Sequence, residues 1–271
     1  MLELRGRRIV LTGASGGIGS ATVRALRGAG AEVVGLDLSP GDGDVTVDVR
    51  DSDSVAAAVE EAVDRLGGLD VLVNNAGIGT SQDAGAAPGD EVLATLDVNV
   101  LGAWRVTAAA MPGLLAAHGR VVNVASGLAF ANVPYAGAYV ASKRGLAGYS
   151  DVLRLEYGDR LSVTTVYPGY IKTAIHDGPA KNGVSLENLV REESVDDAVR
   201  TLKRACGGRP RRDLATSRAG TVELAVARHA PSLVDALVTL RVRRAVAQGT
   251  MPANPFAERP VADRGTTSGA R

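Results

Sequence analysis

The sequence of 271 residues contains a single cysteine, Cys206, and few aromatic residues, which make up 3% of the chain. One cysteine cannot form an intrachain disulfide, so nothing points to an oxidising compartment, and we interpret Cys206 as a small buried apolar side chain. Thirty basic residues balance thirty acidic residues. Without net positive charge or stacking rings, the chain lacks the features of a nucleic-acid-binding protein, and we expect no such partner.

Long hydrophobic runs are also absent. Arg5, Arg7 and Arg8 precede an apolar run over 9–11, but this run stops at Thr12. It is too short for the apolar core of a signal peptide or for a membrane span, so we predict a cytoplasmic protein without membrane contact. A chain of this length buries enough surface to fold without a structural metal, and we expect no metal site.

Short runs rich in β-branched residues alternate with longer segments of helical period. We expect strands at 8–11, 32–36, 45–47, 71–73, 120–124 and 162–166. We expect helices at 20–27, 51–66 and 138–157, and another that ends near Leu115. Apolar strands separated by helices are typical of a parallel sheet covered on both faces. The sequence therefore predicts an α/β fold with one doubly wound (Rossmann) domain.

The C-terminal part predicts a short strand over 211–216 and extra helices near 221–228 and 231–247. From Gly249 the sequence turns to Pro, Gly, Thr and Ser with scattered charges, which is typical of a disordered tail. We predict one domain over residues 1–248 and a disordered tail over 249–271.

A glycine-rich segment, 12–19, lies between the first expected strand and the first expected helix, with Ser15 and Ile18 among its glycines. Glycines at 13, 17 and 19 allow a tight turn and a close approach of the backbone to a pyrophosphate at the helix N-terminus. Asp37 ends the second strand, where a carboxylate accepts hydrogen bonds from ribose hydroxyls and repels a 2′-phosphate. No Lys or Arg occurs over 12–19 or between Leu36 and Asp44, so the pattern predicts NAD rather than NADP.

The same loop also satisfies G-x-S-x-G, the nucleophile elbow of serine hydrolases, through Ser15. That reading requires a histidine partner, and the candidates are His118, His176 and His229. None of them sits at an expected strand end beside an acid, so the hydrolase stays a minor alternative.

Tyr139 and Lys143 are four residues apart on an expected helix and share one face. An ammonium close to a phenol lowers the phenol pKa, which would make Tyr139 a general acid/base near neutral pH. Ser126 ends the fifth strand, and carboxyl ends of strands face the ligand crevice in this architecture.

With these motifs, residues 8–173 resemble the short-chain dehydrogenase/reductase family. The resemblance implies that Asn99, Ser126, Tyr139 and Lys143 form the catalytic set. It implies cofactor contacts from the glycine loop (Gly13, Ser15, Gly17, Ile18, Gly19), Asp37, Asp48, Val49, Asn75, Ala76, Gly77, Tyr139, Lys143, Pro168, Gly169, Ile171 and Thr173. Asn74 to Gly77 form the N-N-A-G segment, and Pro168 to Thr173 are similar to the P-G-x-x-x-T segment that holds the nicotinamide end.

The resemblance also implies a mechanism. Tyr139 exchanges a proton with the substrate oxygen while hydride moves to or from the nicotinamide. Lys143 binds the nicotinamide ribose, Ser126 orients the substrate oxygen, and Asn99 holds a water for proton relay. We predict a homodimer or homotetramer, with dimerisation through the two helices on either side of the 120–124 strand.

The sequence indicates the substrate class only through the residues expected to surround the substrate. Leu128, Phe130 and Tyr135 lie between Ser126 and Tyr139, and a mobile lid is expected over 170–189. These apolar residues favour an apolar secondary alcohol or ketone. The last helix could cover the substrate pocket, lie on a membrane or pack on protein. A catalytically quiet NAD-binding sensor or interaction module also stays open as a function.

Overall fold

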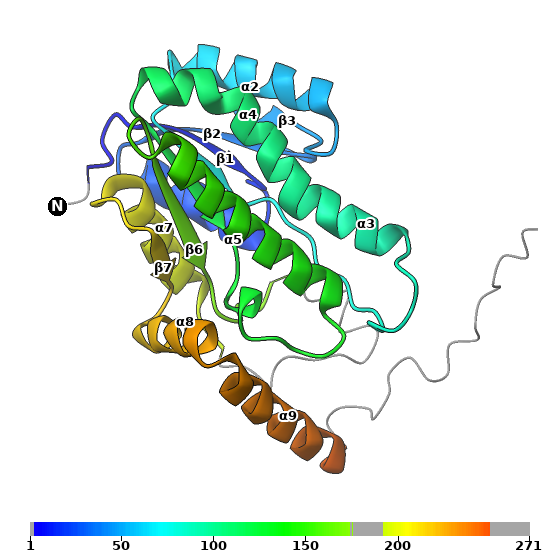
Figure 1. The fold of residues 1–271 in the computed structure, drawn as a ribbon. Coiled ribbons are helices and arrows are strands. Elements are labelled where there is room, and N and C mark those ends of the chain that lie inside the picture. Colours follow the sequence, from blue (N-terminus) through cyan, green and yellow to red (C-terminus); the bar gives the residue numbers. More distant parts are fainter. Residues whose placement is uncertain (1–2, 174, 176–191, 250–271) are drawn as a thin grey trace, which may run out of the picture.

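The computed structural model describes residues 3–173, 175 and 192–249. Its centre is a parallel sheet of seven strands in the order β3-β2-β1-β4-β5-β6-β7 (Figure 1). The strands are β1 (Arg8–Thr12), β2 (Glu32–Asp37), β3 (Val45–Thr46), β4 (Val71–Asn74), β5 (Arg120–Val124), β6 (Ser162–Tyr167) and β7 (Asp213–Ala215). The order reverses between β1 and β4, and this switch point is where open α/β sheets bind ligands. The predicted doubly wound fold is confirmed.

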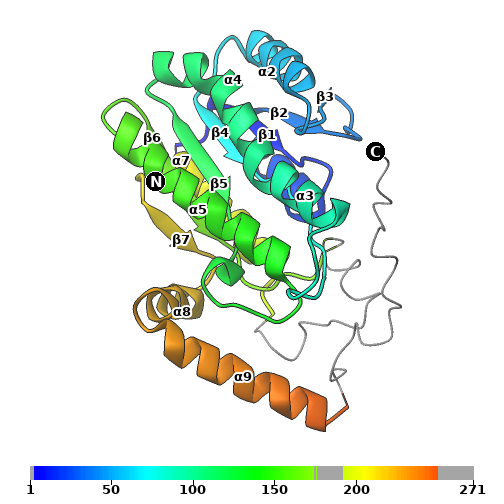
Figure 2. The same cartoon turned by 45° about the vertical axis from the view of Figure 1, so that its right-hand side comes forward.

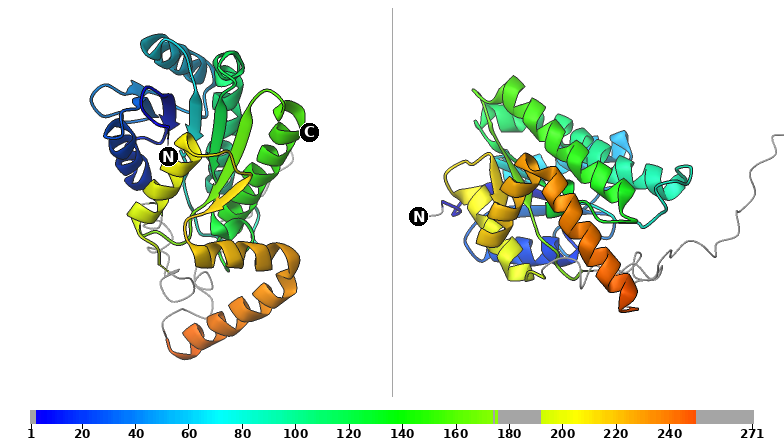
Figure 3. Two further views of the ribbon diagram at one scale, coloured as in Figure 1. Left: turned by 90° about the vertical axis from the view of Figure 1, so that its left-hand side faces the viewer. Right: turned by 60° about the horizontal axis from the view of Figure 1, so that its bottom comes forward.

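Helices cover both faces of the sheet (Figure 3). One face carries α2 (Ser52–Leu66), α4 (Ala103–Ala116) and α5 (Gly137–Tyr157), and the other carries α1 (Gly17–Arg27) and α7 (Val195–Gly207). Each face has its own apolar core, which includes Val106 and Leu146 on the first face and Leu26 and Leu202 on the second. The central strands such as β1 and β4 are buried on both faces, which explains their continuous apolar composition.

Capping residues set the helix ends where the sequence predicts them. The Asp51 side chain accepts hydrogen bonds from the backbone N–H groups of Asp53 and Ser54 at the start of α2. Gly67 ends this helix with a φ of 66°, a conformation that glycine adopts without steric cost. Helix α7 is not among the predicted helices, although Ser194 and Asp197 form a capping box at its start.

The C-terminal helices α8 (Arg218–His229) and α9 (Pro231–Ala247) follow β7 and lie beyond the carboxyl ends of the strands (Figure 2). The predicted short strand and both extra helices are confirmed, with α8 beginning three residues earlier than expected. No helix in the described part of the chain is long and apolar enough to cross a membrane. Of the predicted tail only Gly249 is described, and the predicted lid lies outside the described residues beyond Ile175.

Candidate active site

A cavity of about 800 Å³ opens at the carboxyl ends of the strands. It brings together residues that lie far apart in the sequence, from Gly13 to Ala227. The predicted site residues that line it are Gly13, Ser15, Gly17, Ile18, Gly19, Asp37, Asp48, Val49, Asn75, Ala76, Gly77, Ser126, Tyr139, Lys143, Pro168, Gly169, Ile171 and Thr173. Asn99 is the exception: it is fully buried behind the wall.

The glycine loop is packed so closely that side chains would not fit. A methyl group on Gly19 would lie 1.9 Å from the Gly13 carbonyl oxygen, and Gly13 itself has a φ of +69°. Gly16 is the N-cap of α1 and offers no side-chain acceptor. The N–H groups of the first turn of α1 therefore remain available to an anion, as the phosphate-loop prediction requires.

The N-N-A-G segment braces this loop. Thr12 Oγ1 accepts hydrogen bonds from the backbone N–H groups of Asn75 and Ala76, both at 3.1 Å. Asn75 Nδ2 donates to the carbonyl oxygens of Thr12 and Gly13, also at 3.1 Å. The loop between β1 and α1 is therefore held in place by the end of β4.

Acidic side chains lie at the end of the cavity that β2 and β3 form. Asp37 Oδ2 accepts a hydrogen bond from Ser15 N at 3.0 Å. Asp48 forms an ion pair with Arg50 at 2.6 Å, and hydrogen bonds from Arg50 lower the pKa of Asp48 to about 2. Arg50 also lines the cavity, and it lies outside residues 12–19 and 36–44, which lack Lys and Arg. This end therefore contains one cation as well as the predicted acid.

Ser126, Tyr139 and Lys143 meet in the middle of the cavity, where β5 and α5 come together. Burial raises the pKa of the Tyr139 phenol, and a hydrogen bond with Ser126 lowers it in part. Burial lowers the pKa of Lys143 to about 8. The Lys143 Nζ lies 5.7 Å from the centre of the Tyr139 ring and donates to the Val124 carbonyl oxygen at 2.9 Å.

The prediction that Lys143 lowers the pKa of Tyr139 is wrong for this structure. Both groups are withdrawn from water, and burial disfavours the charged form of each. The phenol is therefore protonated at neutral pH, and the hydrogen bond with Ser126, which favours the phenolate, offsets the effect of burial only in part.

Asn99 lies in a short π-helix, η1 (Asp97–Gly102). Its Nδ2 donates to the Ile78 carbonyl oxygen and to Ser142 Oγ, both at 2.9 Å, and its Oδ1 accepts from Ile78 N at 2.8 Å. Ser142 Oγ in turn donates to the Tyr139 carbonyl oxygen at 2.8 Å. Asn99 thus links the segment after β4 to the helix that carries Tyr139 and Lys143.

Several lining residues were not predicted. Helix α8 contributes Ala219, Gly220, Glu223, Leu224 and Ala227 to the wall. Glu193 Oε2 accepts hydrogen bonds from Gly169 N at 3.0 Å and from Thr216 Oγ1. It therefore holds the Pro168–Gly169 turn. No short motif marks these residues, because they reach the cavity only through the path of the chain after β6.

The expected substrate-side residues are only partly confirmed. Leu128 lines the cavity, whereas Phe130 packs against Tyr167 and Arg228 instead. Tyr135 adopts a φ of 63° and packs in a small apolar cluster with Ala245 of α9. Of the two C-terminal helices, α8 forms the wall of the cavity and α9 packs on the protein beside it.

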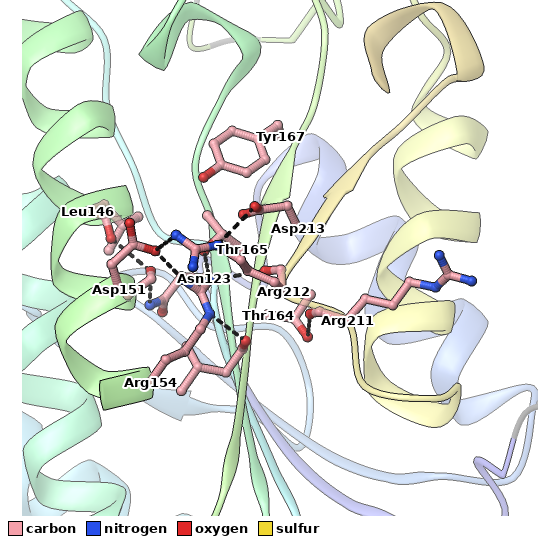
Figure 4. A network of polar contacts seen from close by, with 12 residues as sticks. Asn123, Leu146, Asp151, Arg154, Thr164, Thr165, Tyr167, Arg211, Arg212 and Asp213 are labelled. Carbon is pink, nitrogen blue, oxygen red and sulfur yellow. Dashed lines mark hydrogen bonds and ion pairs between the residues drawn. The ribbon is translucent and has the colours of Figure 1, made fainter. Parts of the chain in front are cut away.

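A polar network fastens β7 to the sheet and so positions α8 (Figure 4). Arg154 of α5 donates to the carbonyl oxygens of Val163 at 2.9 Å and Arg212 at 3.0 Å. Arg212 also pairs with Asp151 at 2.9 Å. Because α8 follows β7 directly, these bonds between α5 and the edge of the sheet fix one wall of the cavity.

Comparison with known proteins agrees with this arrangement. The family model of the short chain dehydrogenases matches residues 7–182. The chain belongs to the short-chain dehydrogenase family. It is 34% identical over 202 residues to the 3-ketodihydrosphingosine reductase of Bacteroides thetaiotaomicron, which covers 72% of this chain and 74% of the relative.

Two solved structures of short-chain dehydrogenases and reductases share the fold. One is a short chain dehydrogenase from Burkholderia cenocepacia in complex with NADP, with a TM-score of 0.73 and 24% sequence identity. The match covers 88% of this chain and 99% of the Burkholderia chain. The other is a 3-ketoacyl-(acyl-carrier-protein) reductase from Brucella melitensis complexed with NADH, with a TM-score of 0.70 and 24% sequence identity. The match covers 79% of this chain and 97% of the Brucella chain. The family consists of oxidoreductases, and its fold binds nicotinamide cofactors.

The described residues fit a dinucleotide. The glycine loop leaves backbone N–H groups open to a pyrophosphate, and Asp37 is placed to accept hydrogen bonds from a ribose. Lys143 uses one of its three N–H donors on Val124, which leaves two for a ligand in the cavity. Ser15, the nucleophile of the hydrolase alternative, donates its hydroxyl to the Ser39 carbonyl oxygen at 2.6 Å, and neither His118 nor His229 lines the cavity. His176 lies outside the described residues.

Proposed function

We propose that this short-chain dehydrogenase is an NAD-dependent oxidoreductase that interconverts an apolar secondary alcohol and its ketone. The observation that carries the proposal is the meeting of Ser126, Tyr139 and Lys143 in one cavity with the glycine loop. A phenol that stays protonated at neutral pH is the acid that a carbonyl oxygen needs when it is reduced.

The residues of the chain divide the chemistry among them. Tyr139 donates its proton to the ketone oxygen, or accepts one from the alcohol, and Ser126 donates a hydrogen bond that orients this oxygen. Lys143 would hold the nicotinamide ribose with its remaining donors. Asn99 acts behind the wall as a positioning residue through Ile78 and Ser142. The bound nicotinamide supplies or accepts the hydride.

Side chains around the reacting group favour an apolar substrate. The wall beside Ser126 and Tyr139 is formed largely by hydrocarbon side chains. They belong to Leu128, Ala131, Ile175, Leu224 and Ala227. Burial of an apolar substrate against them is the main source of binding free energy in such a cavity.

NAD is the proposed cofactor because of Asp37. Its carboxylate lines the cavity beside the glycine loop, where it would repel the 2′-phosphate of NADP. Among the described lining residues, the cation at this end is Arg50, and it is already paired with Asp48. The charge around this end therefore supports NAD.

The test follows nicotinamide absorbance while the purified protein meets a panel of apolar secondary alcohols and ketones, with NAD and NADP side by side. Tyr139→Phe is the matched control, since it removes only the hydroxyl. We expect turnover with NAD that is lost in Tyr139→Phe, with NADH affinity nearly unchanged. NADH binding without turnover of any compound would instead favour a quiet NAD-binding module.

A further inference from the structure

The substrate end of the cavity carries more acidic than basic side chains among the described residues. We define this end as the lining from β5 to α5 and from the end of β6 to α8. Among the described residues there, the charged side chains are Lys143, Glu193 and Glu223. Since Lys143 is committed to the proposed cofactor contact, two carboxylates remain beside the substrate.

Helix α8 directs one face at the cavity, and Glu223 is the only charged residue on that face. The lining residues Ala219, Gly220, Glu223, Leu224 and Ala227 have the spacing of one helical face. Arg228 turns away from this face, because it forms an ion pair with Asp213 at 2.7 Å and donates to the Tyr167 hydroxyl at 2.9 Å. It therefore does not neutralise Glu223.

Among the residues that the structure describes, no cation is paired with either carboxylate. Glu193 accepts its hydrogen bonds from Gly169 N and Thr216 Oγ1, which are neutral donors. Glu223 is exposed and makes no hydrogen bond or ion pair with any residue that the structure describes. An uncompensated carboxylate at the mouth of an apolar cavity attracts a cation and repels an anion.

We infer that the cavity selects an alcohol or ketone that also carries a cationic group such as an ammonium, with Glu223 as the specificity-determining residue. Apolar walls hold the hydrocarbon part of this substrate, and Glu223 on the rim meets its charged end. The inference rests on the proposed function and narrows its substrate class.

The experiment compares methyl ketones that carry one of three end groups on spacers of increasing length: trimethylammonium, tert-butyl or carboxylate. The trimethylammonium and tert-butyl groups differ only in their central atom, nitrogen or carbon, so the two ketones have the same shape and differ in charge. We expect kcat/KM to be highest for the ammonium ketone and lowest for the carboxylate. Glu223→Gln should lower the ratio of ammonium to tert-butyl kcat/KM by about fivefold, the effect of losing one partly exposed ion pair.

The control variant is Asp235→Asn on α9, which removes the same charge outside the cavity lining and should leave the ratio unchanged. Equal kcat/KM for the ammonium and tert-butyl ketones, or an equal loss on both in Glu223→Gln, would overturn the inference and leave the proposed function intact. Failure of all three ketones while compounds of the apolar panel are turned over would overturn the inference alone, and failure of the panel as well, with NAD and with NADP, would overturn both.

Discussion

Lys143 donates a hydrogen bond from Nζ to the carbonyl oxygen of Val124 at 2.9 Å, in the wall of the cavity. The contact holds an ammonium at the end of β5, where burial lowers its pKa to about 8 from 10.5. The folded chain therefore carries a cost for this charge that only a bound ligand can offset.

Lys143→Met should stabilise the protein at neutral pH while turnover is lost. The unfolded chain binds this proton more tightly than the folded chain, so the cost is fully present below pH 8 and disappears as the pH rises through 10.5. We expect the free energy of unfolding of the variant to exceed that of wild type by roughly 2–3 kcal/mol at neutral pH. Urea unfolding over a pH series should show this gap closing between the two pKa values.

The partly exposed Lys203 provides the control, because Lys203→Met removes an ammonium without such burial. A stability gap for Lys143→Met that stays constant with pH would show that packing, not charge, causes it.

Gly19→Ala should abolish tight cofactor binding. Its methyl group would lie 1.9 Å from the Gly13 carbonyl oxygen, so the loop backbone must move away from the position in which it binds a phosphate. We expect NADH affinity to fall at least about tenfold and the free energy of unfolding to fall by roughly 1–3 kcal/mol, measured by fluorescence titration and denaturation.

Gly16→Ala is the matched control for this loop. A methyl group there meets the Gly13 oxygen at 3.4 Å, which is ordinary contact, and Gly16 has a φ of −68°. Equal destabilisation by the two alanines would contradict the steric explanation.

Asp37→Ala should narrow the preference for NAD over NADP. The substitution removes the acceptor for the ribose hydroxyls and the charge that repels a 2′-phosphate. A hydrogen bond to a charged group contributes roughly 1.5 kcal/mol, so NAD affinity should fall about tenfold while NADP affinity does not fall. Asp42→Ala removes an exposed carboxylate of the same loop that does not line the cavity. If both variants discriminate as wild type does, Asp37 is not the selector.

Leu155→Asp should convert the proposed oligomer to smaller species. Leu155 is 87% exposed on α5, and Val152 of the same helix and Trp104 of α4 are about half exposed. These helices are the ones through which the sequence predicts dimerisation, and a buried carboxylate would oppose that contact. Light scattering measures the mass, and Val222→Asp, on the exposed side of α8, is the control. An unchanged mass for Leu155→Asp would place the subunit interface elsewhere.

The fold and most of the lining of the candidate site follow from local sequence signals. The central strands such as β1 and β4 are continuous apolar runs because they are buried on both faces. Asp51 and Gly67 mark the ends of α2 by their own side-chain and backbone chemistry. Gly13 and Gly19 are predictable because no other residue fits the turn. All predicted site residues except Asn99 line one cavity.

What remained hidden depends on contacts between distant segments. Glu223 reaches the cavity only because β7 pairs beside β6 and carries α8 across the ends of the strands. Glu193 is brought there by its backbone hydrogen bond to Tyr170 and by the hydrogen bond that its side chain accepts from Gly169 N. The lowered pKa of Lys143 and the raised pKa of Tyr139 come from burial by several elements at once, which the spacing of four residues does not reveal. The sequence by itself thus determined the sheet, the glycine loop and the chemical groups at the strand ends, because these depend on neighbours in the chain. Tertiary structure alone decided the pKa values of Tyr139 and Lys143 and the shape of the cavity wall, because desolvation and cavity shape arise only when the chain has closed around them.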